Sequence, residues 1–230
     1  TGSFDGSISE GIADAVSVLN TGDPTISPGF FSSGHGIREV ETNRVYPGDW
    51  VGEVHTDGLI FAGAVWDLRS RLAETMGEEE ATHRTSQLLA AAIKSGPTIP
   101  EAFDAFIFAD DDNADLSDGT PHSCEIIEAF SQHGLGPGGN SGSVVVLEHE
   151  ALEAQLPEVE IGVALSAVNL APECVDISLD TATVHFSVDG GDTWSEGALS
   201  GETGELYGVI PAQESGTTVS YYFTLHTDEA

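Results

Sequence analysis

A run of glycine, serine and proline separates two parts of the chain that differ in hydrophobic pattern. The run extends from Gly134 to Ser143. Before it, apolar residues recur at the spacing of α-helices; after it, short alternating stretches end in turn-forming residues. We therefore expect an α + β chain with two domains. A mostly α-helical region covers residues 1–135, a linker covers 136–143, and an all-β region covers 144–230.

The first region predicts five helices and no β-sheet. A long loop rich in glycine, proline and serine follows the first helix, and Glu78, Glu79 and Glu80 suit the positive N-terminal end of the third. From the apolar spacing and the stop signals, the helices are expected at about residues 8–19, 57–76, 78–95, 100–109 and 121–133.

The second region predicts short antiparallel strands, with a hairpin turn at Asp189–Asp192. An immunoglobulin-like or fibronectin-type sandwich, truncated after its last strand, fits this pattern best. Trp194 and the group Tyr221–Phe223 are expected to pack in the core and the hairpin rather than form a platform for carbohydrate. The strands are expected at about residues 144–147, 155–166, 176–179, 182–188, 204–211 and 219–227.

The charge of the chain excludes several classes of partner. Thirty-nine acidic residues stand against six basic ones, which gives a net charge of −33. Nucleic acids and anionic membrane surfaces both require lysine and arginine, so neither is an expected partner. Three explanations of the acidity remain open: a salt-rich habitat, bound calcium, or high solubility of a secreted protein.

Two cysteines, Cys124 and Cys174, lie on either side of the linker. A secreted setting would allow a disulfide between them, whereas two unpaired or separately buried thiols are the alternative.

Glu10 and Asp14 are four residues apart, so they share one face of the first predicted helix. Most such acidic pairs lie on solvated faces. This helix is otherwise small and apolar, however, and carboxylates that are partly buried need a cation or hydrogen-bond donors. One carboxylate could ligate a metal while the other orients a histidine ligand.

Four segments in order resemble the thermolysin-like and fungalysin-like zinc peptidases. The segment Gly6–Asp14 is similar to the helix that carries the third zinc ligand, and Ile37–Val40 with Tyr46–Trp50 is similar to the segment of the substrate-binding arginine. Gly52–Ile60 resembles the segment of the histidine that stabilises the transition state, and the helical segment Phe61–Arg69 continues as it does in bacterial fungalysin-like proteins.

The resemblance implies a role for each matching residue. Glu10 would be the third zinc ligand, and Asp14 would orient a ligand histidine from behind. His55 would donate a hydrogen bond to the tetrahedral intermediate, and Arg38 would hold the substrate carbonyl. Asp49 is the candidate to orient His55, although its spacing differs by one residue from that of thermolysin-like members. The implied parent protein is a secreted, extracellular zinc endopeptidase that acts on proteins or peptides.

One part of the family's zinc site is absent from this sequence. The HExxH motif supplies two histidine ligands and the general base, and the segment that begins at His149 has no second histidine. We therefore expect this chain to be an inactive fragment. Its partner would be the missing N-terminal part, either on the same chain or as a separate one.

An acidic loop before the last predicted helix offers oxygen ligands at alternating positions. Two interpretations stay open: a calcium site, which lacks the EF-hand pattern, or a turn that leads into a helix with Pro121 at its first position. The candidate calcium ligands are Asp111, Asn113, Asp115 and Asp118.

Two other functions remain as alternatives. The chain could be an extracellular structural or adhesive protein with a degenerate peptidase-like fold and no catalysis. The β region could also bind a substrate or a polysaccharide, with the helical region as its support.

Overall fold

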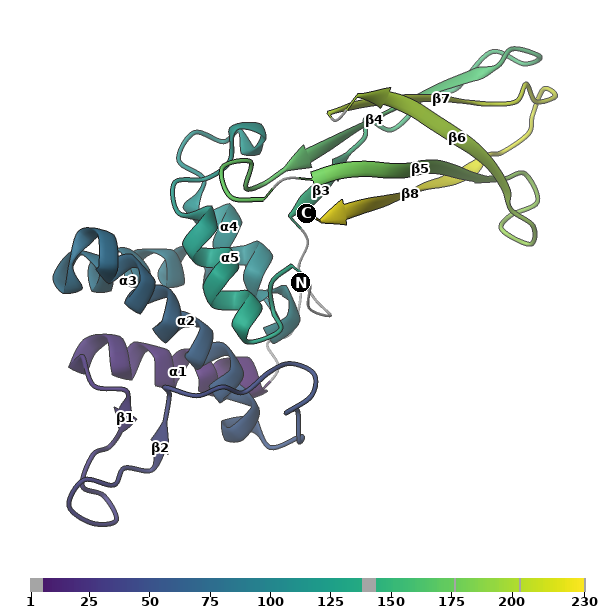
Figure 1. The fold of residues 1–230 in the computed structure, drawn as a ribbon. Helices are drawn as coiled ribbons and strands as arrows, with labels where there is room; N and C mark the ends of the chain where they lie inside the picture. The colour runs from purple at the N-terminus through teal and green to yellow at the C-terminus, as the bar shows by residue number, and fades with distance from the viewer. Residues whose placement is uncertain (1–5, 138–143, 176, 203, 230) are drawn as a thin grey trace. The chain divides into compact units, whose positions relative to one another are not determined.

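The computed structural model describes residues 6–137, 144–175, 177–202 and 204–229. It divides into two compact units, and the division falls between Val144 and Val145. The first unit is mostly helical and the second is built from strands, so the chain is a mixed α + β protein (Figure 1). The predicted linker ends at this division, but its residues 138–143 lie outside the described part of the chain.

All five predicted helices are confirmed, with small changes at their ends. The predicted third helix continues as a short 3-10 helix, Ile93–Ser95, and the fourth is preceded by another, Ile99–Glu101. The α-helices are α1 Gly6–Thr21, α2 Val54–Met76, α3 Glu78–Ala92, α4 Ala102–Asp110 and α5 Ser123–Gln132.

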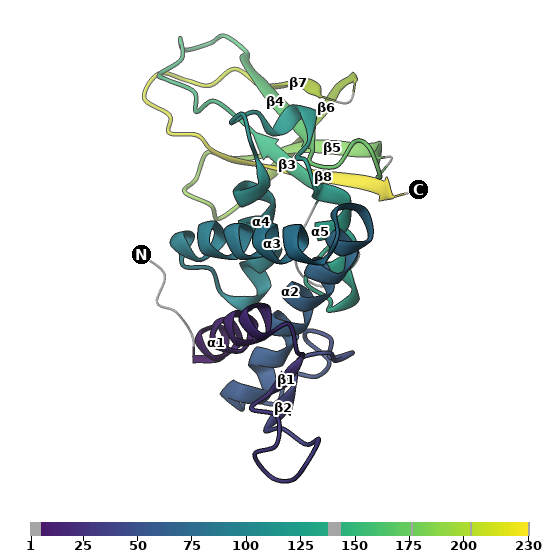
Figure 2. The ribbon, with the colours of Figure 1, turned by 90° about the vertical axis from the view of Figure 1, so that its left-hand side faces the viewer.

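Helix α2 is the centre of the first unit. It packs against α1, α3 and α5, and α4 closes the bundle through α3 and α5 (Figures 1 and 2). Its segment from Gly58 to Trp66 is apolar on every side, and all its residues from Asp57 to Trp66 are buried. The aromatic core is formed by edge-on or tilted contacts among Phe61, Phe103, Phe106 and Phe130.

The expectation that this region has no sheet was wrong in one place. Strands β1 (Thr25–Ile26) and β2 (Arg38–Glu39) pair antiparallel within the long loop. The pairing follows from two apolar anchors, Ile26 and Val40, which are buried in the helical unit. Because both ends of the intervening loop are fixed in this way, their backbones lie within hydrogen-bonding reach.

The second unit is one curled antiparallel sheet of six strands in the order β3-β4-β7-β6-β5-β8. Strand β6 changes partners along its length: Ser195–Leu199 pairs with β5, whereas Ser200–Glu202 pairs with β7. The strands are β3 Val145–Glu148, β4 Ile161–Asn169, β5 Ile177–Ser187, β6 Ser195–Glu202, β7 Glu205–Ile210 and β8 Ser220–Glu229.

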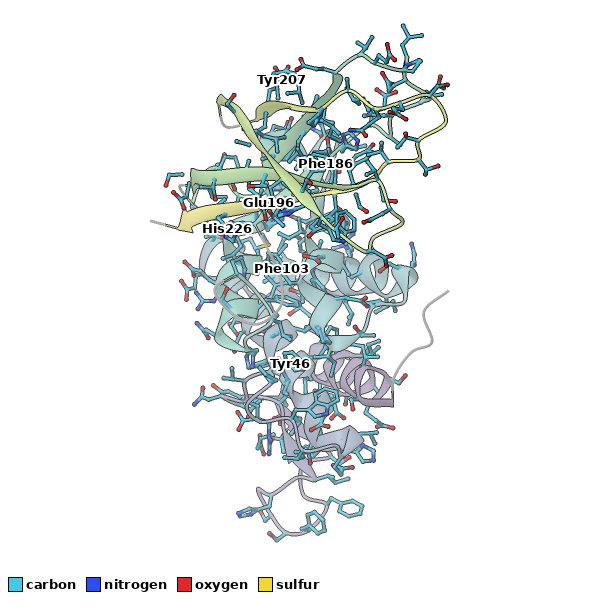
Figure 3. All side chains as sticks on the ribbon, turned by 90° about the vertical axis from the view of Figure 1, so that its right-hand side faces the viewer. Tyr46, Phe103, Phe186, Glu196, Tyr207 and His226 are labelled. Atoms are coloured by element: carbon cyan, nitrogen blue, oxygen red, sulfur yellow. The ribbon has the colours of Figure 1, made fainter. Side chains whose placement is uncertain are left out.

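The core of this unit lies on the concave side of the curled sheet and follows the alternation of the strands. Ile161, Val163 and Leu165 of β4 face Val184 and Phe186 of β5, and all are buried. In Figure 3, Phe186 lies among the strands, whereas Tyr207, which is 55% exposed, lies at their outer side. The predicted hairpin turn connects β5 and β6, with positive φ at both of its central glycines.

Three strand predictions were inaccurate. The strand expected over 155–166 begins only at Ile161, because Pro157 has no N–H to donate and Glu158 has a φ of 61°. The segments 176–179 and 182–188 belong to a single strand, β5, with an irregularity between Leu179 and Thr181.

Strand β6 was missed because it looks like a turn in the sequence, with two glycines and one large apolar residue. Its crossing requires those glycines: a Cβ on Gly201 would lie 2.0 Å from the carbonyl oxygen of Glu205.

A buried carboxylate joins three helices of the first unit. Asp110, at the end of α4, is fully buried and accepts hydrogen bonds from Arg84 Nη2 on α3 at 2.7 Å. It also accepts from the backbone N–H of His122 at 2.6 Å and faces His122 Nδ1 at 2.7 Å, just before α5. Burial raises the pKa of Asp110, but the hydrogen bonds from His122 and Arg84 outweigh it, so the pKa lies below its usual value.

Replacing Asp110 by asparagine is expected to lower the free energy of unfolding by on the order of 3 kcal/mol, because a buried ion pair loses one partner. Urea denaturation followed by helical circular dichroism measures this. Because the pKa of Asp110 is depressed in the folded state, its contribution is present above the unfolded pKa of about 3.9. The gap between wild type and Asp110→Asn should therefore stay constant down to about pH 4 and close below it.

Asp104, on the same helix, provides a control, because its pKa is shifted in the opposite direction to that of Asp110. Burial and the nearby Glu101 raise its pKa, so its ionised form disfavours folding. Asp104→Asn should leave stability at pH 7 unchanged or higher. Equal losses in the two variants would contradict the assigned role of Asp110.

Candidate functional site

Helices α1 and α2 touch through their backbones, and this contact determines which side chains meet. A Cβ on Gly11 would lie 2.6 Å from the carbonyl oxygen of Gly58, and a Cβ on Gly58 would lie 2.8 Å from Gly11 N. Gly6 is likewise close to α2, because a Cβ on Gly6 would lie 2.9 Å from Cγ1 of Val54. The absence of side chains at these positions lets the first turns of the two helices lie side by side, as Figure 1 shows.

The close approach brings Glu10 against His55. Glu10 Oε2 lies 2.9 Å from His55 Nδ1, and the two side chains are 38% and 45% exposed. The contact has the distance of an ion pair without hydrogen-bond geometry, so the buried Nδ1 has no hydrogen-bond partner among the described residues. A carboxylate and an imidazole thus face each other at the surface, where both can be reached from solvent.

One helical turn after Glu10, Asp14 is buried and binds Arg38 of β2 in a bidentate ion pair. Arg38 Nε donates to Oδ2 at 2.8 Å and Nη2 donates to Oδ1 at 2.7 Å. The hydrogen bond to Asp14 raises the pKa of Arg38, and the carboxylates of Glu10 and Glu53 raise it further against the effect of burial. The pair therefore anchors β2, and with it the long loop, to α1.

Glu53 and Asp57 hold the start of α2, where His55 lies. Glu53 caps the helix by accepting from the backbone N–H groups of His55 and Thr56, and the hydrogen bond from the Thr56 hydroxyl is the main cause that lowers its pKa. Asp57 is fully buried and accepts from Val51 N at 2.8 Å and Gly52 N at 2.9 Å. Neither was singled out from the sequence, although an acidic residue in a helix's first turn is a recognisable signal.

The remaining predicted catalytic residue, Asp49, lies in a turn. Its Oδ2 accepts a hydrogen bond from Val45 N at 2.8 Å, and no contact with His55 is found within the described part of the chain. The turn is attached to α5 by the buried His133, whose Nδ1 lies 2.8 Å from the carbonyl oxygen of Arg44 and whose Nε2 lies 3.0 Å from Asp67. The prediction did not identify His133, because nothing in its sequence neighbourhood indicates these long-range partners.

The acidic loop is closed by hydrogen bonds among its own residues. Asp111 accepts from the backbone N–H of Asn113, and Asn113 Nδ2 donates to Asp118. Asp115 accepts from Ser117, which lowers its pKa. These contacts form a turn, and calcium binding at this loop stays a prediction.

Metal clusters, membrane spans and free thiols are all missing from the part of the chain that the structure describes. No group of three or more His, Cys, Asp or Glu side chains is placed to hold a metal within the ranges that the structure describes. None of the helices in those ranges combines the length and apolar character of a membrane span. Neither Cys124 nor Cys174 is a free thiol.

Of the residues predicted from separate motifs, Glu10, Asp14, Arg38 and His55 are brought together. Asp49 and the acidic loop are not part of their contacts. No protein-family model, no curated protein and no solved structure matches the chain. The geometry of the cluster therefore stands on its own.

Substituting Gly58 by alanine is expected to force α1 and α2 apart, because the new Cβ would meet two backbone atoms at 2.8 Å. The expected loss of stability is about 1–3 kcal/mol, the cost of overpacking. Thermal denaturation measures the loss, and the imidazole signals of His55 in NMR spectra should shift as Glu10 moves away. Gly48→Ala, whose Cβ would meet only Val45 O at 3.8 Å, is the control; an equal effect there would refute the explanation.

Proposed function

We propose that this chain carries one half of the catalytic site of a secreted zinc endopeptidase that hydrolyses peptide bonds. The observation that supports it most is the convergence of Glu10, Asp14, Arg38 and His55. They come from three separate motifs, and they meet through the Asp14–Arg38 ion pair and the Glu10–His55 contact, on α1, β2 and the start of α2.

The donor set fits zinc in part. Glu10 is a partly exposed carboxylate, a common ligand in catalytic zinc sites. Each carboxylate oxygen of Asp14 accepts one hydrogen bond from Arg38. Each oxygen has a second lone pair, which could accept a hydrogen bond from a histidine ligand and so orient it. Bound zinc would supply an activated water and polarise the scissile carbonyl.

The chain's own residues would position the substrate and stabilise charge. Because His55 Nδ1 faces Glu10, its Nε2 is the nitrogen that would donate a hydrogen bond to the developing oxyanion. Two N–H groups of Arg38 donate to Asp14, so a substrate carbonyl would have to accept from one of the others. A guanidinium has five N–H donors, so Arg38 can bind Asp14 and a substrate carbonyl together. In the structure Asp49 supports the turn before α2, so we no longer assign it the orientation of His55.

We further propose that the site is completed by an N-terminal part that carries the HExxH motif, and that this chain alone is inert. The second unit would be an immunoglobulin-like module, which the antiparallel strands and the change of partner along β6 support. Secretion is supported by the absence of free thiols. Calcium at the acidic loop would have to displace its internal hydrogen bonds, so zinc is the principal metal proposed.

The same two contacts, Asp14–Arg38 and Glu10–His55, also support a second function, that of a structural protein. Asp14 and Arg38 form an ion pair, and Glu10 lies 2.9 Å from the imidazole of His55, so the cluster can exist as a structural network of polar contacts without metal. In that case the protein would be an extracellular structural or adhesive protein with a degenerate peptidase-like fold.

The test is to express the longer protein that includes the sequence before Thr1 and to measure its zinc content and its hydrolysis of a quenched fluorescent peptide. Glu10→Gln should lose bound zinc and activity together. His55→Phe should retain zinc while kcat falls by about 10²–10³-fold, as expected for one oxyanion donor. The exposed Glu41→Gln serves as the control and should change neither quantity.

Two results would reject the peptidase. The first is an upstream helix that is intact but has other residues in place of its histidines. The second is zinc content in Glu10→Gln equal to that of the wild type. Either result would leave the structural protein as the better explanation.

A further inference from the structure

The loop between β5 and β6 is tightly connected by hydrogen bonds, although it is exposed. Asp189 accepts from Thr193 N at 2.9 Å, from the Thr193 hydroxyl at 2.6 Å and from the Ser187 hydroxyl at 2.7 Å. The Ser187 hydroxyl in turn accepts from Gly191 N at 2.9 Å. Side chains that follow this loop are therefore held in one orientation without burial.

The residue held by this loop is Trp194, which is 43% exposed. Its Nε1–H donates to the carbonyl oxygen of Gly191 at 3.1 Å, and its ring meets that of Tyr222 at 4.9 Å and 67°. Tyr222, which is 45% exposed, stacks on His185 at 4.6 Å and 9°. His185 is fixed by Thr224 Oγ1 at 2.8 Å and by Glu196 at 3.5 Å.

The predicted core and hairpin packing holds for Trp194, which packs on the hairpin turn, and for Tyr221 and Phe223, which pack on the core. Tyr222 does not lie in the core, and strand alternation explains why. Tyr221 and Phe223 point to the core of the sheet, so the residue between them points outward. The result is a cluster of three rings in contact, which we call the ring surface and define as Trp194, Tyr222 and His185; Trp194 and Tyr222 are exposed, and His185 lies partly buried beneath Tyr222. Exposed tryptophan and tyrosine on a rigid support are typical anchors of binding sites.

The charge of the second unit indicates which ligand this surface suits. Residues 145–230 contain sixteen Asp and Glu and no Lys or Arg, because all six basic residues lie at or before Lys94. Exposed carboxylates of Asp192 and Glu196 flank the rings in the sequence and on the strand. Aromatic faces attract cations, and a uniformly negative field concentrates cationic ligands near them.

We propose that the ring surface binds cationic side chains, arginine or lysine, of a basic polypeptide partner. The planar guanidinium of arginine would stack on the indole of Trp194, while Asp192 and Glu196 accept its N–H groups. This site lies entirely in the second unit and does not depend on the zinc proposal. A neutral sugar, which would use the rings but gain nothing from the charge, is the competing ligand.

The test follows the indole N–H signals of the full 230-residue chain by NMR, with Trp194 assigned from the Trp194→Phe variant. The probe is an eight-residue peptide of alternating arginine and serine, and the control peptide has citrulline, which is neutral, in place of arginine. The arginine peptide should shift the Trp194 signal and leave those of Trp50 and Trp66 unchanged. The citrulline peptide should shift none of them.

Two variants distinguish the contribution of the rings to binding from that of the overall negative charge. Tyr222→Leu should weaken binding by about 2- to 5-fold, the range of an exposed cation–π contact. Tyr207→Leu, which removes a still more exposed tyrosine from another strand of the same unit, should leave the binding unchanged. Three results would overturn the proposal: equal losses in the two variants, equal shifts with the two peptides, or a Trp194 shift with maltohexaose but not with the arginine peptide.

Discussion

The backbone contact between Gly11 and Gly58 is the constraint on which the candidate site depends. It leaves no room for a Cβ on either helix, so the first turns of α1 and α2 share one surface. Glu10 lies one residue before Gly11, and His55 lies three residues before Gly58, so the contact of the two glycines brings Glu10 and His55 together. Asp14, a turn further along α1, then secures Arg38 and the long loop. Any function assigned to the cluster relies on this packing, whether catalytic or structural.

The helices were predictable because their apolar spacing agrees with the packing around α2. The grouping of Glu10, Asp14, Arg38 and His55 was anticipated only through motif order, since residues 14 and 38 lie on different elements. Contacts that depend on tertiary approach were not predicted: those of Asp110 with Arg84 and His122, and that of His133 with the Arg44 carbonyl. Strand β6 was missed for the same reason, because its glycines serve a crossing that the sequence does not indicate.

The basic residues all lie in the first unit, so the acidic residues of the second unit have no lysine or arginine to balance them. The first unit contains every arginine and lysine, and four of the five arginines form ion pairs that join elements: Arg38, Arg69, Arg71 and Arg84. The second unit has no such cations and is held by its apolar core and by side-chain hydrogen bonds such as those of Asp189. Its uncompensated field is therefore available to act on a partner.

Zinc-edge anomalous diffraction from crystals of the longer protein tests the central claim most directly. The account predicts a single strong anomalous peak within about 2.0–2.2 Å of a Glu10 carboxylate oxygen. Asp14 and His55 should lie close to it without ligating it. A zinc peak elsewhere, or stoichiometric zinc with no Glu10 oxygen within that distance, would contradict the account.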